Sequence, residues 1–437
     1  MKKITTIVAV LFAATNLFSQ VTFTRMWERS DSAFTETSLV ANQKPSYLDA
    51  NTRGIAYGNI NSNTGMVERF FLVSRSGEGN VVRVLDAATG TSIKSMDNTG
   101  IAGGGFPISD IGITEDGVLL VSNCTHSSSG PFKIYKYTSE DAQPIEAISF
   151  PSGAIRYGDK ITVTGRYSDG TARIYTIGGT ILTNYKVQYF GMEQLATNWQ
   201  FKQTPSELNT NITAAVSNFH QFTPGPDGGF YFRSVGLNDF QQFKADLTAN
   251  IGNTHPTSIA QGGTTPVFIK TVGGFDYACY LRYGSGAFSK LANNLVEVVK
   301  IDRSIGISSA IVVASTPSLG KTAPGNGAGH VAVKLLPNGD VDIFVLSSIN
   351  GIARYKLTGF TTGVENTKTD NIRLITTKNQ LTVEGVAVSS VEIFNSLGQK
   401  VKSENRNIIN TAGLQGIYLV NIKEAGITVK TVKVLLK

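Results

Sequence analysis

The feature that most constrains this sequence is an internal repeat. One unit occurs six times between residues 52 and 360, and each unit holds two apolar strands, a polar loop and an aromatic-rich third strand. First strands of successive units begin about 44 to 66 residues apart, close to the spacing of propeller repeats. Because a small sheet cannot bury both faces alone, repeated sheets pack against one another. The repeat predicts an all-β chain whose sheets are arranged as the blades of a β-propeller.

The six units are defined by their strands. The predicted first strands are residues 54–57, 110–113, 154–157, 220–222, 267–270 and 330–333. The second strands are residues 70–74, 118–122, 161–164, 230–232, 277–280 and 341–345, and the third are 81–85, 132–135, 172–175, 242–244, 296–299 and 353–356. Residues 145–150 and 308–314 are expected to add fourth strands. Three of the turns from first to second strand carry Gly117, Gly228 and Gly339 after Asp or Asn, as hairpins with positive φ require.

The ends of the repeat region suggest how the ring closes. The sixth unit has no obvious fourth strand before residue 361, whereas residues 21–27 form an isolated apolar and aromatic strand. This segment is expected to complete the last sheet, which favours six blades. Seven blades is the alternative, because residues 183–218 could contain a degenerate unit. The 45 glycines, the 16% charged residues and the absence of long helical periodicity support an all-β fold.

The two cysteines are expected to be buried and unpaired. Cys124 and Cys279 fall in second strands of units two and five, which are opposite each other in a ring of six. Their Cα separation would then exceed the ~7 Å limit for a disulfide. The sequence also has no Cys/His spacing typical of a metal site, so no metal ligand is predicted.

Residues 371–437 differ from the repeats and consist of short strands and tight turns. Val391–Val401 is a hairpin with a Gly in its turn, Leu414–Val420 is a turn leading into a strand, and the last strand places Val432, Val434 and Leu436 on one face. This order resembles the C-terminal sorting domain of the type IX (Por) secretion system. The resemblance implies a small β-sandwich that is removed after export, with release or attachment to surface lipopolysaccharide. The alternative is a plain β-sandwich that only packs on its neighbour.

The first residues fit the same destination. Met1-Lys2-Lys3 is a positive segment, Ile4–Phe18 is apolar but too short to span a membrane, and Ser19-Gln20 is a plausible cleavage point. No other stretch approaches the ~18 apolar residues of a membrane-spanning helix. We expect a signal peptide at 1–19, a propeller at 20–360, a linker at 361–370 and a sorting domain at 371–437. The protein is expected outside the cell or on the outer-membrane surface, and its expected partner is the type IX machinery.

The net charge of +7 does not indicate nucleic-acid binding. All of it comes from residues 1–19 and 366–437, so residues 20–365 are neutral overall. The basic isoelectric point is therefore no evidence for nucleic-acid binding, and a local basic patch stays open as an alternative.

Candidate site residues follow from propeller geometry. First strands line the central channel, and the loops that enter them share one face with the loops between second and third strands. The expected ligand-binding residues at strand entries are Arg53, Asp110, His220 and His330, and those in the loops are Arg75, Arg166 and Arg282. As solvent-facing groups around one channel mouth, they could bind a carboxylate or a sugar. No catalytic motif and no cofactor site is identified.

Residues 20–360 resemble secreted β-propeller proteins of uncharacterised function that carry the same sorting domain. Together with the absence of a catalytic motif, this predicts a binding module for a glycan, a peptide or a partner protein. The alternative is a polysaccharide hydrolase or lyase that uses the channel rim. Such an enzyme would need paired carboxylates there, and Asp110 is the only obvious one.

Overall fold

The computed structural model describes residues 21–31, 44–75, 79–126, 129–180, 183–208, 221–233, 241–245, 263–283, 294–324, 329–360, 372–395, 398–424 and 427–436. The predicted signal peptide and linker lie outside the described residues. Contacts between Cα atoms divide the chain into Gln20–Gly359 and a second unit that contains Phe360–Lys437.

The expectation of an all-β chain is confirmed. Helical structure in the described residues is confined to single 3-10 turns, η1 (Pro226–Gly228) and η3 (Ile307–Ser309). No helix in this part of the chain has the length and apolar character to cross a membrane.

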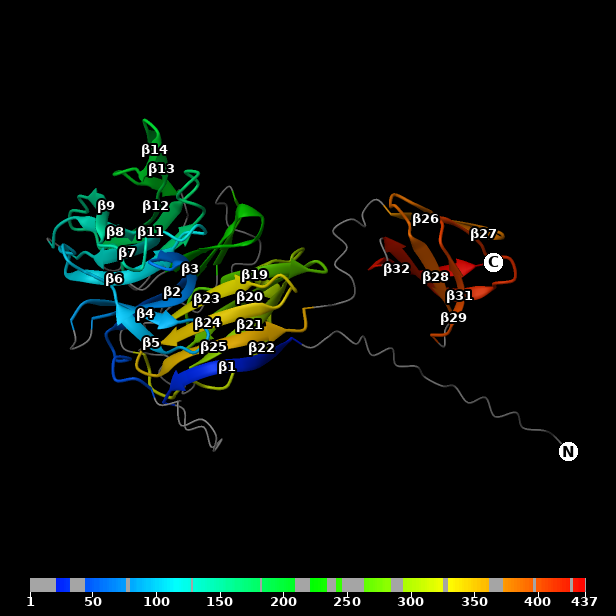
Figure 1. The fold of residues 1–437 in the computed structure, drawn as a ribbon, viewed down its shortest axis with the longest axis horizontal. Helices are drawn as coiled ribbons and strands as arrows, with labels where there is room; N and C mark the ends of the chain where they lie inside the picture. Colours follow the sequence, from blue (N-terminus) through cyan, green and yellow to red (C-terminus); the bar gives the residue numbers. More distant parts are fainter. Residues whose placement is uncertain are drawn as a thin grey trace. The chain divides into compact units, whose positions relative to one another are not determined.

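Antiparallel sheets build the first unit (Figure 1). The first sheet contains β2 (Thr52–Ser62), β3 (Gly65–Ser74), β4 (Val81–Asp86) and β5 (Ser92–Ser95). The second contains β6 (Phe106–Ile113), β7 (Leu119–Cys124), β8 (Phe132–Tyr137) and β9 (Ile145–Phe150). The third contains β10 (Ile161–Thr164), β11 (Arg173–Thr180), β12 (Thr183–Phe190) and β15 (Ser206–Leu208). A separate hairpin joins β13 (Met192–Leu195) to β14 (Asn198–Phe201).

Three further sheets follow along the chain. The fourth contains β16 (Gln221–Pro224), β17 (Phe230–Arg233) and β18 (Gln241–Phe243). The fifth contains β19 (Val267–Val272), β20 (Phe275–Arg282), β21 (Leu295–Asp302) and β22 (Ile311–Ser315). The sixth contains β23 (Gly329–Leu335), β24 (Val341–Ser347), β25 (Gly351–Thr358) and β1 (Thr22–Ser30).

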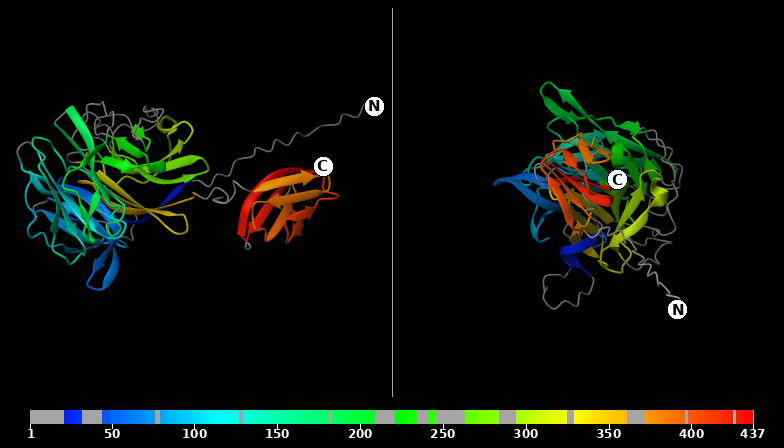
Figure 2. Two further views of the ribbon diagram at one scale, coloured as in Figure 1. Left: turned by 90° about the horizontal axis from the view of Figure 1, so that it is seen from above. Right: turned by 90° about the vertical axis from the view of Figure 1, so that its right-hand side faces the viewer.

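The first strands of these sheets follow one another in a closed order. β2 contacts β6, β6 contacts β10, and the series continues through β16, β19 and β23 back to β2. Figure 2 shows the same sheets from two further directions, in sequence colours from blue through green to gold. The first unit is therefore a β-propeller, with the first strands innermost.

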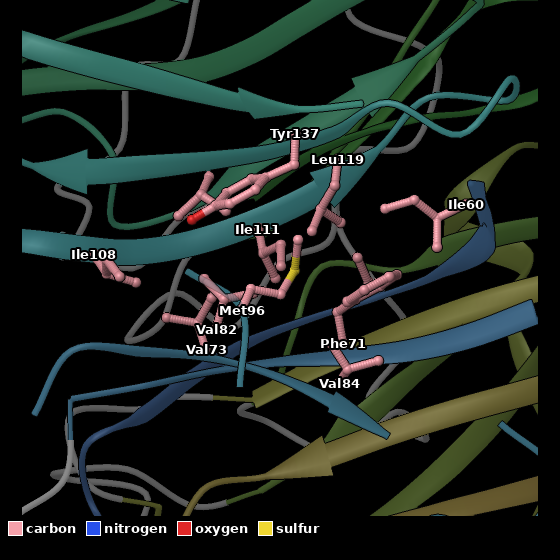
Figure 3. Close-up of a cluster of buried hydrophobic side chains, with 12 residues drawn as sticks. Ile60, Phe71, Val73, Val82, Val84, Met96, Ile108, Ile111, Leu119 and Tyr137 are labelled. Carbon is pink, nitrogen blue, oxygen red and sulfur yellow. The ribbon is translucent and has the colours of Figure 1, made fainter. Parts of the chain in front are cut away.

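Neighbouring sheets are held together by apolar faces. Figure 3 shows the cluster between the first and second sheets, where Phe71 and Val84 pack with Leu119 and Tyr137. Every one of these side chains is fully buried. Burial of this kind contributes roughly 1.5–3 kcal/mol for each large apolar side chain, so contacts between sheets dominate the stability of the ring.

The predicted closure by the N-terminal segment is confirmed. β1 pairs antiparallel with β25, from Thr22 opposite Thr358 to Ser30 opposite Gly351. Trp27 of β1 is buried in a cluster with Phe70 and Phe344, and its indole N–H donates to the carbonyl of Ala87 at 3.0 Å. The segment that precedes the repeats and the last repeat thus share one sheet, in which β1 is the fourth strand.

The order of the strands in the third sheet was predicted wrongly. Residues 161–164 form β10, the first strand, rather than the second, and residues 173–180 form β11, the second. Residues 154–157 form no strand: Arg156 makes one isolated bridge to Gly179. Gly153 and Gly158, which flank residues 154–157, have positive φ values of 61° and 83°, a conformation that does not continue a strand. In the described part of residues 183–218, β12 and β15 belong to this same sheet.

Both cysteines are free and buried, as expected. Burial raises the pKa of the Cys124 thiol to about 12, so it is protonated at physiological pH.

The second unit contains two antiparallel sheets. One contains β26 (Arg373–Thr377), β27 (Gln380–Glu384) and β30 (Ile408–Asn410). The other contains β29 (Lys400–Glu404), β28 (Ser390–Phe394), β31 (Gly416–Glu424) and β32 (Ile427–Leu436). Leu381 of the first sheet and Ile393 of the second belong to one buried cluster, so the two sheets share a core.

Candidate functional site

Polar side chains gather where the regular pairing of first strands begins; Asp110 is the fifth residue of β6, but it is the first to pair with β7 after the irregularity that follows Phe106. Arg53 lies in β2, Asp110 in β6 and His330 in β23. Hydrogen bonds and ion pairs join these residues to others just before β10 and at the start of β16. The resulting strand-entry cluster consists of Arg53, Asp110, Asp159, Lys160, Gln221 and His330.

Asp110 connects three sheets. Its Oδ2 accepts a hydrogen bond from the backbone N–H of Ile161 at 2.8 Å, and its Oδ1 lies 3.5 Å from Nζ of Lys160. Lys160 also donates to the carbonyl of Arg53 at 2.8 Å. A bulge between Thr52 and Gly54 leaves Arg53 outside the regular pairing of β2 with β3, so this carbonyl is available to Lys160. Burial raises the pKa of Asp110 and lowers the pKa of Lys160, while the attraction between their charges opposes both shifts.

A second carboxylate, Asp159, lies between two guanidinium groups. Both oxygens of Asp159 accept hydrogen bonds from Arg156, one of them at 2.6 Å. NH2 of Arg53 lies 3.7 Å from Oδ1 of Asp159. The Asp159 carboxylate raises the pKa of Arg156, whereas burial lowers the pKa of Arg53. Asp159 therefore connects two arginines, Arg53 of β2 and Arg156 in the segment before β10.

His330 connects the sixth sheet to the first and the fourth. Its Nδ1 accepts a hydrogen bond from the backbone N–H of Ile55 at 3.2 Å, so Nε2 carries the proton in the neutral ring. Nε2 of His330 lies 3.3 Å from Nε2 of Gln221, and this contact becomes a hydrogen bond once the Gln221 amide is turned so that its oxygen accepts from the Nε2–H group. Burial, with the nearby positive charge of Lys160, lowers the pKa of His330 well below its usual value. The imidazole is neutral at physiological pH.

The expectation that the entry residues face solvent is wrong. Arg53, Asp110 and His330 are exposed to only 2%, 0% and 6%. The physical reason is that each reaches a backbone group or an opposite charge of a neighbouring sheet rather than the channel mouth. Three of the predicted residues are thus brought together, and they bind sheets to one another.

A cavity of about 200 Å³ lies beside the cluster. Residues from all six first strands line it, and His330 and Gln221 contribute its most polar part. The rest of the wall is largely apolar, with side chains such as Ile55, Ile111 and Val267. The cavity therefore occupies the centre of the ring of first strands.

Of the other predicted residues, Arg75 lies next to the strand-entry cluster, whereas Arg282 and Arg166 pair with Glu297 and Asp169. Arg75 follows β3 and donates to the carbonyl of Ile108 at 3.0 Å and to Oγ of Ser109 at 2.7 Å. Burial and the nearby Arg53 lower the pKa of Arg75 to about 10. Arg282 ends β20 and donates to Oε1 of Glu297 in the same sheet at 3.0 Å. The side chains of Arg75 and Arg282 thus form hydrogen bonds with other residues of the protein.

Arg166 was assigned to the wrong loop. It follows β10 and therefore lies between a first and a second strand, at the opposite end of its sheet from the strand entries. It is exposed, and its Nε lies 3.8 Å from Oδ2 of Asp169. His220 lies outside the described residues.

Sequence reasoning missed Asp159, Lys160 and Gln221. Asp159 and Lys160 are the two residues before Ile161 of β10. Asp110 in β6 and Arg53 in β2 likewise lie one and two residues before an isoleucine of their own first strands. The signal is present in the sequence, but the prediction of residues 161–164 as a second strand hides it. In the described part of the chain, no group of three or more His, Cys, Asp or Glu side chains is placed to hold a metal ion.

No protein-family model and no curated protein matches this chain. Among solved structures, it is similar to a DUF4623 family protein from Bacteroides eggerthii, with 15% identity, a TM-score of 0.52, and coverage of 71% of this chain and 72% of that one. An α-L-arabinanase from Penicillium chrysogenum, complexed with arabinobiose, gives 11% identity, a TM-score of 0.44, and coverage of 73% and 96%. A duf4221 family member from Bacteroides vulgatus gives 8%, 0.38, and coverage of 78% and 99%. The first similarity concerns the fold alone.

Proposed function

We propose that this protein is an exported binding module built on a six-bladed β-propeller. In the described part of the first unit, six sheets of three or four strands have their first strands in closed contact, β1 completes the sixth of them, and the two-stranded β13–β14 sheet stands apart; this arrangement supports the blade count. The second unit is then the small β-sandwich of a type IX sorting domain. Its β28–β29 hairpin, β31 and β32 coincide with the three segments that carry the resemblance.

The observation that carries the binding role is a largely apolar cavity that lies next to a polar cluster whose residues bind one another and backbone groups. A volume of about 200 Å³ is below the ~300–1,000 Å³ typical of pockets for drug-sized ligands. It suits one group of a larger partner, such as a side chain of a peptide or protein, or the edge of a sugar. The cluster beside it keeps the first strands in place and so fixes the shape of the cavity.

Catalysis by the same groups is less well supported. Asp110 is bound by Lys160 and a backbone N–H, and Asp159 is bound by Arg156 and Arg53. A glycosidase needs one carboxyl group that protonates a leaving group and a second that acts on the sugar. Buried carboxylates held in ion pairs are poorly placed for both tasks.

The site of action follows from the two ends of the chain. We propose that residues 1–19 direct export, that residues 371–437 engage the type IX machinery, and that the propeller works outside the cell or on the outer-membrane surface. Anchoring to lipopolysaccharide after removal of the sorting domain belongs to the same proposal.

The binding role is tested by narrowing the cavity. Ala332 lines it from β23, so Ala332→Leu fills part of the volume. Ala314 lies in β22, outside the cavity lining, and Ala314→Leu is the matched control. Arrays of glycans and peptides are probed with residues 20–437 of each form. We expect a ligand that the unmodified protein and Ala314→Leu retain and Ala332→Leu loses. Because Ala332 also packs against the cluster that contains Phe344, the larger side chain should lower the melting temperature, and binding is measured well below the melting temperature of each form. Equal retention by Ala332→Leu would exclude the cavity as the binding site.

A further inference from the structure

A second concave surface lies on the third sheet, away from the strand-entry cluster. We call it the β10–β15 groove. It has a volume of about 530 Å³ and is bounded by β10, β11, β12, β15 and the base of the β13–β14 hairpin. The groove residues that matter here are Thr164, Arg173, Tyr175, Tyr189, Lys202 and Ser206. Its volume lies within the ~300–1,000 Å³ range of ligand pockets.

The strand register places most of these side chains on one face. Tyr175 of β11 is directly opposite Tyr189 of β12, which is opposite Ser206 of β15. Thr164 is opposite Arg173, and Arg173 lies two residues from Tyr175 on the same strand. Because directly paired residues share a face and side chains alternate along a strand, the five side chains lie on one face of the sheet. Tyr175 is only 5% exposed and packs against Phe222 and Phe230, so it forms the floor of the groove, and Tyr189 is the more accessible ring.

Lys202 is brought to this surface by the hairpin base. Its backbone N–H donates to the carbonyl of Gly191 at 2.9 Å, and the hydroxyl of Tyr167 donates to the carbonyl of Trp199 at 2.9 Å. Gly170 also has to be glycine, because a Cβ there would lie 2.5 Å from the Trp199 ring. These contacts hold the hairpin against the loop that follows β10, so the wall that carries Lys202 is fixed.

The groove is positively charged. Its lining contains a guanidinium and an ammonium group and no carboxylate. Within the described residues, neither Arg173 nor Lys202 forms an ion pair, and the guanidinium carbon of Arg173 lies 5.2 Å from the centre of the Tyr189 ring. Contact with the Tyr189 ring restricts the orientation of the guanidinium, so less conformational entropy is lost when it binds an anion.

We propose that the β10–β15 groove binds an acidic saccharide. A carboxylate or sulfate of the sugar would accept hydrogen bonds from the forked guanidinium of Arg173 and from Lys202. The hydroxyls of Thr164 and Ser206 would bind sugar hydroxyls, with the Tyr189 ring beside the sugar. This inference goes beyond the proposed cavity site and does not depend on it, since the two surfaces share no residue used here.

Calorimetric titration of residues 20–437 tests the proposal with four probes. They are tetragalacturonate, the same oligosaccharide with its carboxylates reduced to neutral hydroxymethyl groups, a chondroitin sulfate tetrasaccharide, and inorganic phosphate. The variants are Arg173→Gln, Arg173→Lys, Lys202→Gln and, as matched control, Arg166→Gln. Arg166 precedes the same strand but does not line the groove. Because these side chains are exposed, the variants should fold, and melting temperatures verify it.

We expect one or both acidic saccharides to bind, and the neutral one to bind at least about tenfold more weakly, equivalent to about 1.4 kcal/mol. Arg173→Gln should lose about tenfold or more, Arg173→Lys should lose less, and Arg166→Gln should change affinity less than about twofold. The two acidic probes distinguish a carboxylate from a sulfate as the recognised group.

Four outcomes would overturn the inference. They are absence of binding by both acidic probes, equal affinity for the neutral probe, equal affinity for phosphate, or unchanged affinity in Arg173→Gln. If any of these four outcomes is found, and Ala332→Leu loses a ligand that the arrays identify for the unmodified protein, the groove inference fails while the proposed function stands. Acidic-saccharide binding that depends on Arg173 but not on Ala332 supports the groove and leaves the cavity role to its own test.

Discussion

The carboxylate of Asp110 occupies the space where a side chain at Gly54 would begin. A Cβ atom added to Gly54 would lie 1.9 Å from Oδ1 of Asp110, far inside contact distance. Gly54 belongs to the first sheet and Asp110 to the second, so the missing side chain in one sheet lets the other sheet's carboxylate reach Lys160.

Gly54→Ala should therefore destabilise the propeller. The methyl group displaces the Asp110 carboxylate from its buried partners, and overpacking of this kind costs about 1–3 kcal/mol. Urea unfolding measures the loss. Gly191→Ala is the control, because a Cβ there makes only an ordinary contact of 3.4 Å with Tyr189. Equal stability of the two variants would contradict the role assigned to Gly54.

Closure by β1 predicts a large effect at Trp27. Trp27→Ala removes a buried indole from the contact between the sixth and first sheets, at a cost of about 3–5 kcal/mol. Met26, the neighbouring residue, is 45% exposed, so Met26→Ala should change stability by less than about 0.5 kcal/mol. Thermal unfolding of both variants provides the comparison, and a melting temperature for Trp27→Ala equal to that of Met26→Ala would argue against closure.

His330 predicts a pH dependence of stability. Its folded-state pKa is depressed below the ordinary value near 6.5, so the unfolded chain binds a proton at this residue before the folded chain does. Its stabilising contribution is present above pH ~6.5 and is lost as pH falls below it, by up to about 1.4 kcal/mol per pH unit. The free energy of unfolding in urea, measured at about pH 7.5, 6.5 and 5.5, should fall between the second and third values. These pH values lie on both sides of the unperturbed histidine pKa.

His330→Gln should flatten that dependence, because the substituted side chain does not titrate. His126 is exposed, and His126→Gln should keep the profile of the unmodified protein. If His330→Gln loses stability on acidification as steeply as the unmodified protein, another group is responsible.

Deletion of residues 371–437 should retain the protein in the periplasm of a host with a type IX system. The two units have separate cores, so the propeller should keep its melting temperature after the deletion. Cell fractionation with an antibody to the propeller measures the distribution. Surface display of the truncated protein, in amounts equal to the full chain, would refute the sorting role.

Residue patterns alone predicted much of this fold. Alternating apolar residues predicted the first three strands of the first, second, fourth, fifth and sixth sheets, and the orphan segment at residues 21–27 was correctly matched to the last of these. Turn residues such as Gly117, Gly228 and Gly339 have the positive φ that their hairpins required. These features are local, because side-chain periodicity and backbone sterics act within a few residues.

The tertiary structure decided the third sheet and the site. Periodicity marks a strand but not its rank in a sheet, so residues 154–157 and 161–164 could not be ordered until β10 had paired with β11. The same limit hid Asp159 and Lys160. Whether Arg53, Asp110 and His330 face water or a neighbouring sheet depends on how closely first strands approach across the ring. That distance is set by packing between residues more than a hundred positions apart, which no local pattern encodes.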